Sequence, residues 1–276
     1  MDSSEHKWLG VGSIWLIATT DDATGEVPCA LFVDSDSTDN NMRVIKRLIE
    51  LKGIPVALYT DGASHFMTQR HYSYRVNLKY DYTPTQIQRA LNELGVRLII
   101  AGSPQAKGRI ERVFKTFQDR LLKELKLHEI SSIEEANKYL HNVFLFKFNK
   151  RFTRDPENPE PAWRVVPREI NLDSVFSIKE QRTVMADNTI SFRNRIFQIL
   201  PDKYRISFAK AKVVVEKRLD GSIKIKYKDR YLDFKEITSY ETKRNKTNTL
   251  PIENLCTGDI FTLHQGGHFL FVLTEC

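Results

Sequence analysis

Two carboxylates stand in local settings that could support phosphodiester chemistry. Asp61 directly follows the apolar run PVALYT, and Glu111 lies in SPQAKGRIERVFKTFQDRLLKEL, with 49 residues between the two. The short apolar run is typical of a strand buried on both faces, and ligand sites of open α/β sheets gather beyond the carboxyl ends of strands. Carboxylate oxygens are the ligands that Mg²⁺ prefers, and two such ions can activate a nucleophile and stabilise the leaving oxygen of a phosphodiester. The pair therefore indicates a candidate site for Mg²⁺-dependent phosphoryl transfer, with Mn²⁺ as the other candidate ion.

A two-ion site needs a third carboxylate on a strand beside Asp61. The candidates are Asp2, Asp21, Asp22 and Asp34. Asp21 and Asp22 belong to DDATG, whose residue types suit a hairpin turn, and turn formation explains them better than metal binding does. Spacing alone leaves the choice among the four open.

The segment around Glu111 is predicted to be a helix. One face repeats every three or four residues and is apolar: Ile110, Val113, Phe114, Phe117, Leu121, Leu122 and Leu125. Basic residues occupy the other faces, and Lys107, Arg109 and Lys115 are predicted to face DNA phosphate near the site. The alternative is a solvated helix face whose ion pairs contribute about 0.3–0.5 kcal/mol each.

The first 150 residues alternate between strands and helices. The predicted strands are 14–20, 27–33, 55–60 and 96–100, and the predicted helices are 38–52, 83–95, 103–125 and 131–150. Thr38 or Asp39 is expected to cap the first helix and Thr83 the second, while Gly53 ends the first. This order predicts a mixed sheet with helices on its faces, with a loop or insertion at 63–82.

The second half changes character. Residues 151–167 contain four prolines and predict an extended connector, and beyond about Val175 the apolar residues recur every second position. Short alternating strands, with Asp220-Gly221 as a hairpin signal, predict a small β-barrel. Lys217, Lys224, Lys226 and Lys228 are predicted phosphate contacts on it. No domain pattern follows residue 238.

Composition points to a polyanionic partner. The net charge is +7, and residues 203–246 carry 14 Lys and Arg against 6 Asp and Glu, a surplus of 8 that leaves the remainder at −1. Such a segment favours nucleic acid. No run of 18 apolar residues predicts a membrane span, no secretory signal is visible, and three cysteines without ligand spacing fit a reducing cytoplasm. His6, His65 and His71 have no ligand spacing and are interpreted as incidental.

Several of these segments together resemble the DDE transposase and retroviral-integrase core. LYTDGASHF and the Glu of SPQAKGRIERVFKTFQDRL match its second and third motifs, and the first half is most similar to bacterial insertion-sequence transposases of the ISNCY type. In that group a "DGS-H-WL" stretch precedes a hairpin with "DDATG" in its turn, as MDSSEHKWL precedes WLIATTDDATGEVPCALF here. FNKRF, RTVMADNTISFRNRIFQIL and VEKRLDGSIKIKYKDRYLDFKEI resemble the end of the core and the C-terminal barrel.

The resemblance implies an activity and a site. Asp2, Asp61 and Glu111 would be the catalytic, Mg²⁺-binding residues of an RNase H-like core at 1–150, followed by a connector at 151–175, a small SH3-like DNA-binding barrel at 176–237 and an unassigned tail at 238–276. The implied activity is cleavage and strand transfer at the ends of an insertion sequence, by a homo-oligomer on double-stranded DNA in the bacterial cytoplasm, associated with the nucleoid.

One departure from the family favours a different interpretation. Family members carry helix-turn-helix segments before the first aspartate, and only Met1 precedes Asp2 here. Because few ladder hydrogen bonds could offset about 1–2 kcal/mol of backbone entropy per ordered residue, this end is expected to fray. The alternative function is then a truncated, catalytically defective DNA-binding remnant.

Overall fold

The structure is a computed structural model that describes residues 1–10, 12–67, 84–101, 104–158, 160 and 162–237, without the side chains of 104–107. The chain separates into two compact units, and each is described by itself. Unit 1 comprises Met1–Arg182 and Lys212–Leu232, and unit 2 comprises Thr183–Ala211 and Asp233–Cys276. The predicted insertion beyond residue 67 and the tail from 238 lie outside the described residues.

Strands of both orientations form the centre of unit 1. β1 (Asp2–His6), β2 (Ile14–Thr19) and β3 (Cys29–Val33) form an antiparallel sheet, and β5 (Ala57–Thr60) pairs in parallel with β6 (Arg97–Ile100). The Met1 nitrogen donates a 2.8 Å hydrogen bond to the Tyr59 carbonyl, which links the end of β1 to β5. The mixed α/β class predicted from the sequence is thereby confirmed.

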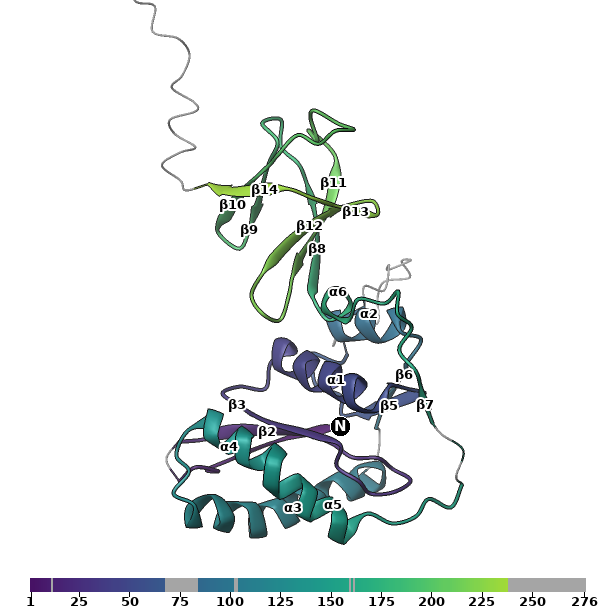
Figure 1. Cartoon of the computed structure of the whole chain (residues 1–276), viewed down its shortest axis with the longest axis vertical. Helices are drawn as coiled ribbons and strands as arrows, with labels where there is room; N and C mark the ends of the chain where they lie inside the picture. The colour runs from purple at the N-terminus through teal and green to yellow at the C-terminus, as the bar shows by residue number, and fades with distance from the viewer. Residues whose placement is uncertain (11, 68–83, 102–103, 159, 161, 238–276) are drawn as a thin grey trace, which may run out of the picture. The chain divides into compact units, whose positions relative to one another are not determined.

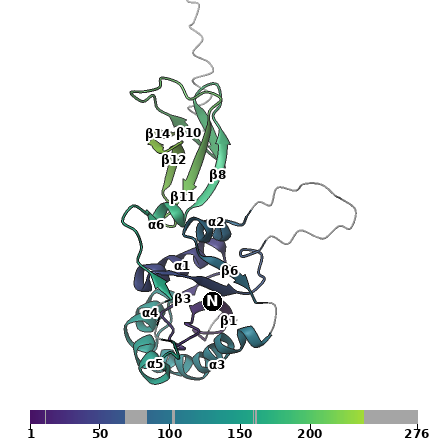
Figure 2. The same ribbon diagram turned by 90° about the vertical axis from the view of Figure 1, so that its right-hand side faces the viewer.

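Helices cover both faces of the β1–β3 sheet. On one face lie α1 (Thr38–Lys52) and α2 (Gln86–Glu93), whose core includes Ile17, Ile45 and Leu48. The other face packs against a second group of helices, with Leu16, Phe32 and Phe117 in its core. This group is α3 (Pro104–Leu127), α4 (Ile133–Tyr139), the π-helical turn η1 (Leu140–Phe144) and α5 (Leu145–Phe152). Figures 1 and 2 show α1 and α3 on opposite sides of these strands.

Caps set where the first two helices begin and end. Ser37, not Thr38 or Asp39, accepts from the Asn40 amide and caps α1. Thr85 caps α2 in a reciprocal capping box with Gln88, whereas the expected cap Thr83 lies outside the described residues. Gly53 ends α1 as predicted, with φ of 97°. An added Cβ there would lie 2.5 Å from the Arg164 carbonyl oxygen, so glycine is required both for its backbone conformation and for space.

The proline-rich connector returns to the core. Its strand β7 (Trp163–Arg164) pairs with β4 (Ile54–Pro55), and it ends in the short helix α6 (Leu172–Val175). Trp163 packs against the core cluster that contains the buried residues of α1. The connector is therefore extended, as predicted, and it also pairs with the α/β part through β7 and β4.

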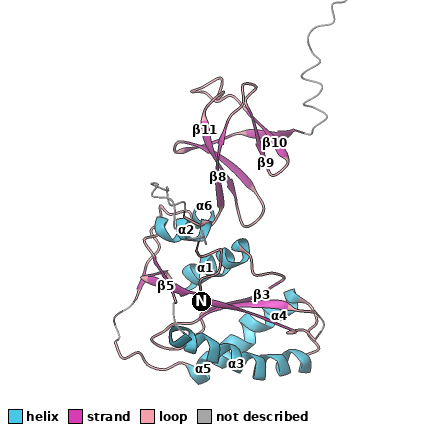
Figure 3. Ribbon diagram, turned by 180° about the vertical axis from the view of Figure 1, so that it is seen from behind, coloured by secondary structure: helices cyan, strands magenta, loops and turns pink. Residues whose placement is uncertain are grey.

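The β-rich segment forms two sheets. β8 (Ile178–Thr183), β11 (Lys212–Lys217), β12 (Ile223–Tyr227) and β13 (Arg230–Leu232) form a four-stranded sheet, and β9 (Thr189–Phe192), β10 (Arg195–Ile199) and β14 (Phe234–Ile237) form a three-stranded one. Figure 3 shows these strands in magenta. Asp220-Gly221 turns β11 into β12, as predicted. Among the described strands the hydrogen-bonded ladders do not close into the predicted barrel.

Two observations bear on the compositional predictions. Among the helices that the structure describes, none is both long and apolar enough to cross a membrane. Cys29 is buried in the sheet, and this burial raises the pKa of its thiol to about 12, so at neutral pH it is a neutral packing group.

Candidate active site and nucleic-acid interface

Asp61 lies directly after β5, where the strand leaves the sheet. Its Oδ1 accepts a 3.1 Å hydrogen bond from the Ala63 amide, which turns the backbone away from the strand direction. The side chain is half-buried. Asp61 therefore sits at the carboxyl end of a parallel strand, the place at which ligand sites of α/β sheets form.

Asp2 is the first residue of β1, and its end of the strand is held firmly. The ladder with β2 extends over five residue pairs, from Asp2 opposite Ala18 to His6 opposite Ile14. Met1 is 7% exposed and bonds to Tyr59. The expectation that this end frays is wrong, because pairing on β2 and the bond to β5 hold Met1 and Asp2 from both sides.

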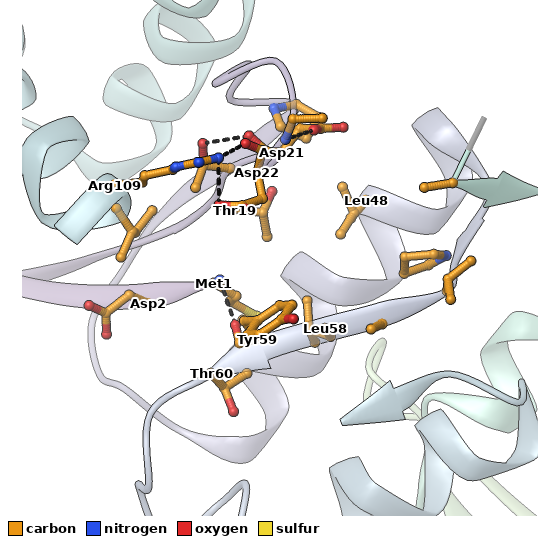
Figure 4. Close-up of a pocket in the computed structure, with 18 of the residues that line it drawn as sticks. Met1, Asp2, Thr19, Asp21, Asp22, Leu48, Leu58, Tyr59, Thr60 and Arg109 are labelled. Carbon is orange, nitrogen blue, oxygen red and sulfur yellow. Dashed lines mark hydrogen bonds and ion pairs between the residues drawn. The ribbon is translucent and has the colours of Figure 1, made fainter. Parts of the chain in front are cut away.

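Asp2 and Asp61 line one cavity of about 560 Å³. Its walls include Thr19, Asp21 and Tyr59, and Figure 4 shows Met1 bonded to Tyr59 within it. Two aspartates that are 59 positions apart in the sequence thus line one cavity. Hard oxygen donors from two neighbouring strands fit a divalent cation such as Mg²⁺.

Glu111 lies on α3 outside the lining of this cavity. Its side chain is exposed, although its neighbours Arg109 and Ile110 both line the cavity. Across the part of the chain that the structure describes, no three His, Cys, Asp or Glu side chains form a group that could hold a metal ion. The structure therefore brings together two of the three predicted carboxylates and leaves the third on the adjoining helix.

The other aspartate candidates take different roles. Asp21 Oδ1 accepts from the amides of Ala23 and Thr24, at 2.8 and 3.2 Å, which confirms it as a turn former. Asp22 pairs with Arg109, whose Nη1 lies 2.9 Å from Asp22 Oδ1 and also donates to the Asp22 carbonyl (Figure 4). Asp34 is exposed and accepts from Ser35 and Asn40.

Of the predicted DNA-facing residues of α3, Arg109 lines the cavity. Arg109 is 55% exposed and its partner Asp22 is 77% exposed, and an ion pair this accessible contributes about 0.2–1 kcal/mol. A phosphate could therefore replace Asp22 as the partner of Arg109 at small cost. Lys115 is exposed on the same helix, and Lys107 lies among the residues whose side chains are outside the description.

The lysines predicted on the β-rich segment differ in their surroundings. Lys224 is exposed and Lys226 half-buried, and both lie on one face of β12 because Ile225 between them is buried on the other. Lys228 is exposed just beyond that strand. Lys217 instead pairs with Asp39 on α1, at 2.5 Å from Nζ to Oδ2, and is only 24% exposed. This ion pair gives Lys217 a structural contact that its alternating position did not indicate.

Opposite Lys224 stands a buried carboxylate that the sequence pattern did not reveal. Glu216 is 1% exposed, and its two oxygens accept from Ser174 at 2.9 Å and Tyr231 at 3.1 Å. A buried carboxylate needs such donors because an unpaired one is costly. Glu216 follows three valines in VVVEK, and the local sequence carries no signal of its burial.

The structure gives His65 a polar neighbour that its spacing in the sequence did not indicate. Its side chain is 13% exposed, and Nε2 lies 3.5 Å from Oδ1 of Asp36, which is 15% exposed. Asp36 also accepts from Ser3 Oγ at 2.7 Å and from Asn41 Nδ2 at 2.5 Å. No spacing rule connects these residues, so only the fold shows that they meet. His6 stacks edge-on against Trp8, and His71 lies outside the described residues.

Comparison with known proteins identifies a class of relatives. No protein-family model matches the chain. The chain is similar over most of its length to bacterial transposases, which confirms the resemblance seen in the motifs around Asp61 and Glu111.

Two transposases illustrate this similarity. The putative transposase y4bF of Sinorhizobium fredii (strain NBRC 101917 / NGR234) is 29% identical over 263 residues, which cover 94% of this chain and 56% of that protein. The transposase for insertion sequence IS1202 of Streptococcus pneumoniae is 31% identical over 242 residues, which cover 87% and 51%. The chain thus spans about half the length of the curated relatives it matches. A chain of a simian T-cell lymphotropic virus intasome in complex with PP2A regulatory subunit B56 gamma has a TM-score of 0.40 and 13% identity, over 86% of this chain and 77% of that chain.

Proposed function

We propose that the chain is the catalytic portion of a DNA transposase, which cuts and joins the ends of an insertion sequence by divalent-cation-dependent phosphoryl transfer. The observation that carries the proposal is the shared cavity of Asp2 and Asp61. The sequence similarity to transposases supplies the substrate class, which is double-stranded DNA at the ends of the element and at the target. A homo-oligomer on DNA, associated with the nucleoid, belongs to the same proposal.

An RNase H-like core is part of this proposal. Three antiparallel strands, β1 to β3, are followed by the parallel pair β5 and β6, and the bond between Met1 and Tyr59 places β1 beside β5. An order β3-β2-β1-β5-β6, with helices on both faces of β1–β3, would suit the RNase H-like core that the resemblance implies. In that order Asp2 and Asp61 lie on adjacent strands.

Asp2 and Asp61 would hold Mg²⁺, or Mn²⁺ in its place, and Glu111 would complete the set. When bound, the ions would activate the attacking hydroxyl and stabilise the leaving oxygen. The chain itself contributes position and charge: β1 and β5 fix the two aspartates, and Arg109 at the cavity wall can contact a phosphate beside them. Glu111 lies outside the cavity lining, so its part in the proposal requires a different placement of the start of α3 when DNA is bound.

The position of Glu111 outside the cavity lining also favours a second candidate function. If α3 keeps the described placement on DNA, the site has two carboxylates and the chain is a DNA-binding protein with defective cleavage. Incubation with duplex DNA that carries the ends of the element, with Mg²⁺ or with EDTA, separates the two functions. Mg²⁺-dependent nicking at the ends supports the transposase, whereas DNA binding without nicking supports the DNA-binding protein with defective cleavage.

Lys224 and Lys226 lead to a prediction for DNA affinity. We expect Lys224→Gln and Lys226→Gln to weaken duplex binding uniformly across sequences, because lysines contact phosphates rather than base edges. Each replacement should reduce the slope of log affinity against log salt by about 1. Fluorescence anisotropy across a salt series measures both quantities.

The control for this prediction is Lys138→Gln. Lys138 on α4 is 69% exposed and pairs with Glu134, so the replacement removes the same charge elsewhere on unit 1. Its salt slope should match that of the wild type. Equal slopes for all three variants would mean that net charge, and not the face of β12, governs binding.

A further inference from the structure

We propose that Asp36 and His65 are positioning residues, which hold the two cavity carboxylates in register through contacts to their neighbours in the chain. This inference rests on the proposed function, because it concerns the same site. Neither residue lines the cavity. Each acts on a carboxylate through another residue.

The first connection leads from Asp36 to Asp2. Asp36 lies in the loop between β3 and α1, and its Oδ2 accepts a 2.7 Å hydrogen bond from Ser3 Oγ. Ser3 follows Asp2 directly in β1, and its amide donates to Asp2 Oδ1 at 3.0 Å. A side chain fixed at Ser3 therefore limits how far the backbone at Asp2 can rotate or shift.

The second connection leads from Asp36 to Asp61. His65 closes the turn that follows Asp61, in which the amides of Phe66 and Met67 both bond to the Ala63 carbonyl. Its Nε2 faces Asp36 Oδ1 at 3.5 Å, and its ring packs edge-on against Phe66, with centroids 4.8 Å apart. Phe66 is 3% exposed and belongs to the core. The turn that sets the direction of Asp61 thus lies against Asp36 on one side, where His65 Nε2 makes no hydrogen bond at this distance, and against the apolar core on the other.

Asp36 itself is held by the core. Asn41 on α1 is 2% exposed, and its Nδ2 donates to Asp36 Oδ1 at 2.5 Å and to the Ser37 carbonyl at 3.0 Å. The buried amide fixes the carboxylate, so Asp36 joins three elements: β1, α1 and the turn after β5. Active sites require supporting contacts of this kind, because a displacement of about 1 Å can cost a factor of about 10² in rate.

The test compares Asp36→Ala, His65→Ala and the double variant in the full chain. Mn²⁺ is the probe, and electron paramagnetic resonance of the free ion gives its affinity. We expect each single replacement to weaken Mn²⁺ binding about 10-fold, comparable with the loss of a residue that orients a metal ligand. The double variant should bind Mn²⁺ only slightly more weakly than Asp36→Ala, because that single replacement already removes the contact between His65 and Asp36.

Amide hydrogen exchange gives a readout that needs no metal. The Ser3 and Ala63 amides bond to the carboxylates of Asp2 and Asp61, so their exchange reports the order of these two side chains. In Asp36→Ala both amides should exchange about 10-fold faster, while His65→Ala should affect Ala63 more than Ser3. A merely structural role would instead raise exchange throughout the core and lower the unfolding midpoint.

Asp34→Ala is the matched control. Asp34 lies two residues from Asp36 in the same loop, is exposed, and bonds to Ser35 and Asn40. It should keep wild-type Mn²⁺ affinity and wild-type exchange at Ser3 and Ala63. Unchanged affinity and exchange in folded Asp36→Ala and His65→Ala would overturn the inference.

Two further outcomes are also decisive. If Asp36→Ala does not fold, His65→Ala answers the question alone: wild-type exchange at Ala63 overturns the inference, and faster exchange there supports it. If the wild-type chain neither binds Mn²⁺ nor nicks DNA, the proposed function fails. The exchange measurement still decides whether Asp36 and His65 position the two aspartates.

Discussion

Replacement of Asp61 by asparagine is expected to abolish divalent-dependent cleavage of DNA while leaving DNA affinity unchanged. Asp61 lies at the end of β5 on the cavity that it shares with Asp2. Asparagine keeps the shape and can still accept from the Ala63 amide, so the turn should survive and only the negative charge is lost. Loss of one preorganised electrostatic contact to a transition state typically costs a factor of about 10²–10³, and loss of a residue that would hold the metal ion should cost at least as much.

DNA affinity should persist because it arises elsewhere. Phosphate binding depends on Lys and Arg side chains, and Asp61 makes no favourable contact with a polyanion. Nicking of end-containing DNA in Mg²⁺ and anisotropy at fixed salt measure the two properties separately. Asp34→Asn, which removes an exposed carboxylate outside the cavity, should behave as the wild type in both assays.

The same assay applied to the other two carboxylates distinguishes the candidate functions. Asp2→Asn should match Asp61→Asn, because both side chains line the cavity. Glu111→Gln should match them only if α3 takes a different placement on DNA, since Glu111 is exposed and outside the lining in the described structure. Nicking that survives Asp61→Asn in an otherwise active protein would contradict the assignment of the site.

Periodic features of this chain could be predicted because they depend on local patterning. The apolar face of α3 repeats at helical spacing from Ile110 to Leu125, and its predicted members are buried or partly buried. The Asp-rich turn, the hairpin at Asp220-Gly221 and the end of α1 at Gly53 follow from backbone conformations that few residue types adopt. Each of these signals lies within a few residues of the feature it specifies.

Features that depend on distant pairing could not be predicted in the same way. Alternation identified the strands of the second half, but it does not say that β10 pairs with β14, where Ile196 stands opposite Ile237. The contact of Asp36 with His65 joins polar residues 29 positions apart that share no period. The expected fraying at Asp2 was wrong for the same reason, because the bond from Met1 to Tyr59 spans 58 positions.

The candidate site could be predicted only in part, because one of its residues follows from a local signal and the positions of the others depend on the fold. Asp61 could be placed because a buried strand delivers it to the end of a sheet, which is a local signal with a general consequence. Its proximity to Asp2 depends on the order of strands, which no local signal gives; the resemblance named Asp2, and the bond from Met1 to Tyr59 lies between β1 and β5. The placement of Glu111 depends on how the start of α3 sits, and helical periodicity does not determine that.

The largest expected effect on stability comes from Phe117 at the middle of α3. Its side chain is fully buried and makes edge-on contacts with Phe144 at 5.1 Å and Phe148 at 4.9 Å between ring centroids. Phe117→Ala removes the ring, leaves a cavity between α3 and α5, and loses two aromatic contacts. We expect a decrease in the free energy of unfolding of about 3–5 kcal/mol, measured by urea denaturation followed by circular dichroism.

Phe146→Ala is the matched control, because it removes the same side chain from α5 where it is 70% exposed. Its free energy of unfolding should stay within about 0.5 kcal/mol of the wild type, as for surface replacements in general. Phe117→Ala should also impair cleavage under conditions where it remains folded, because the ring packs α3, the helix that carries Glu111, against the sheet and α5. A loss below about 1 kcal/mol for Phe117→Ala would show that α3 is not packed on the sheet as described. Glu111 would then have no fixed position relative to Asp2 and Asp61.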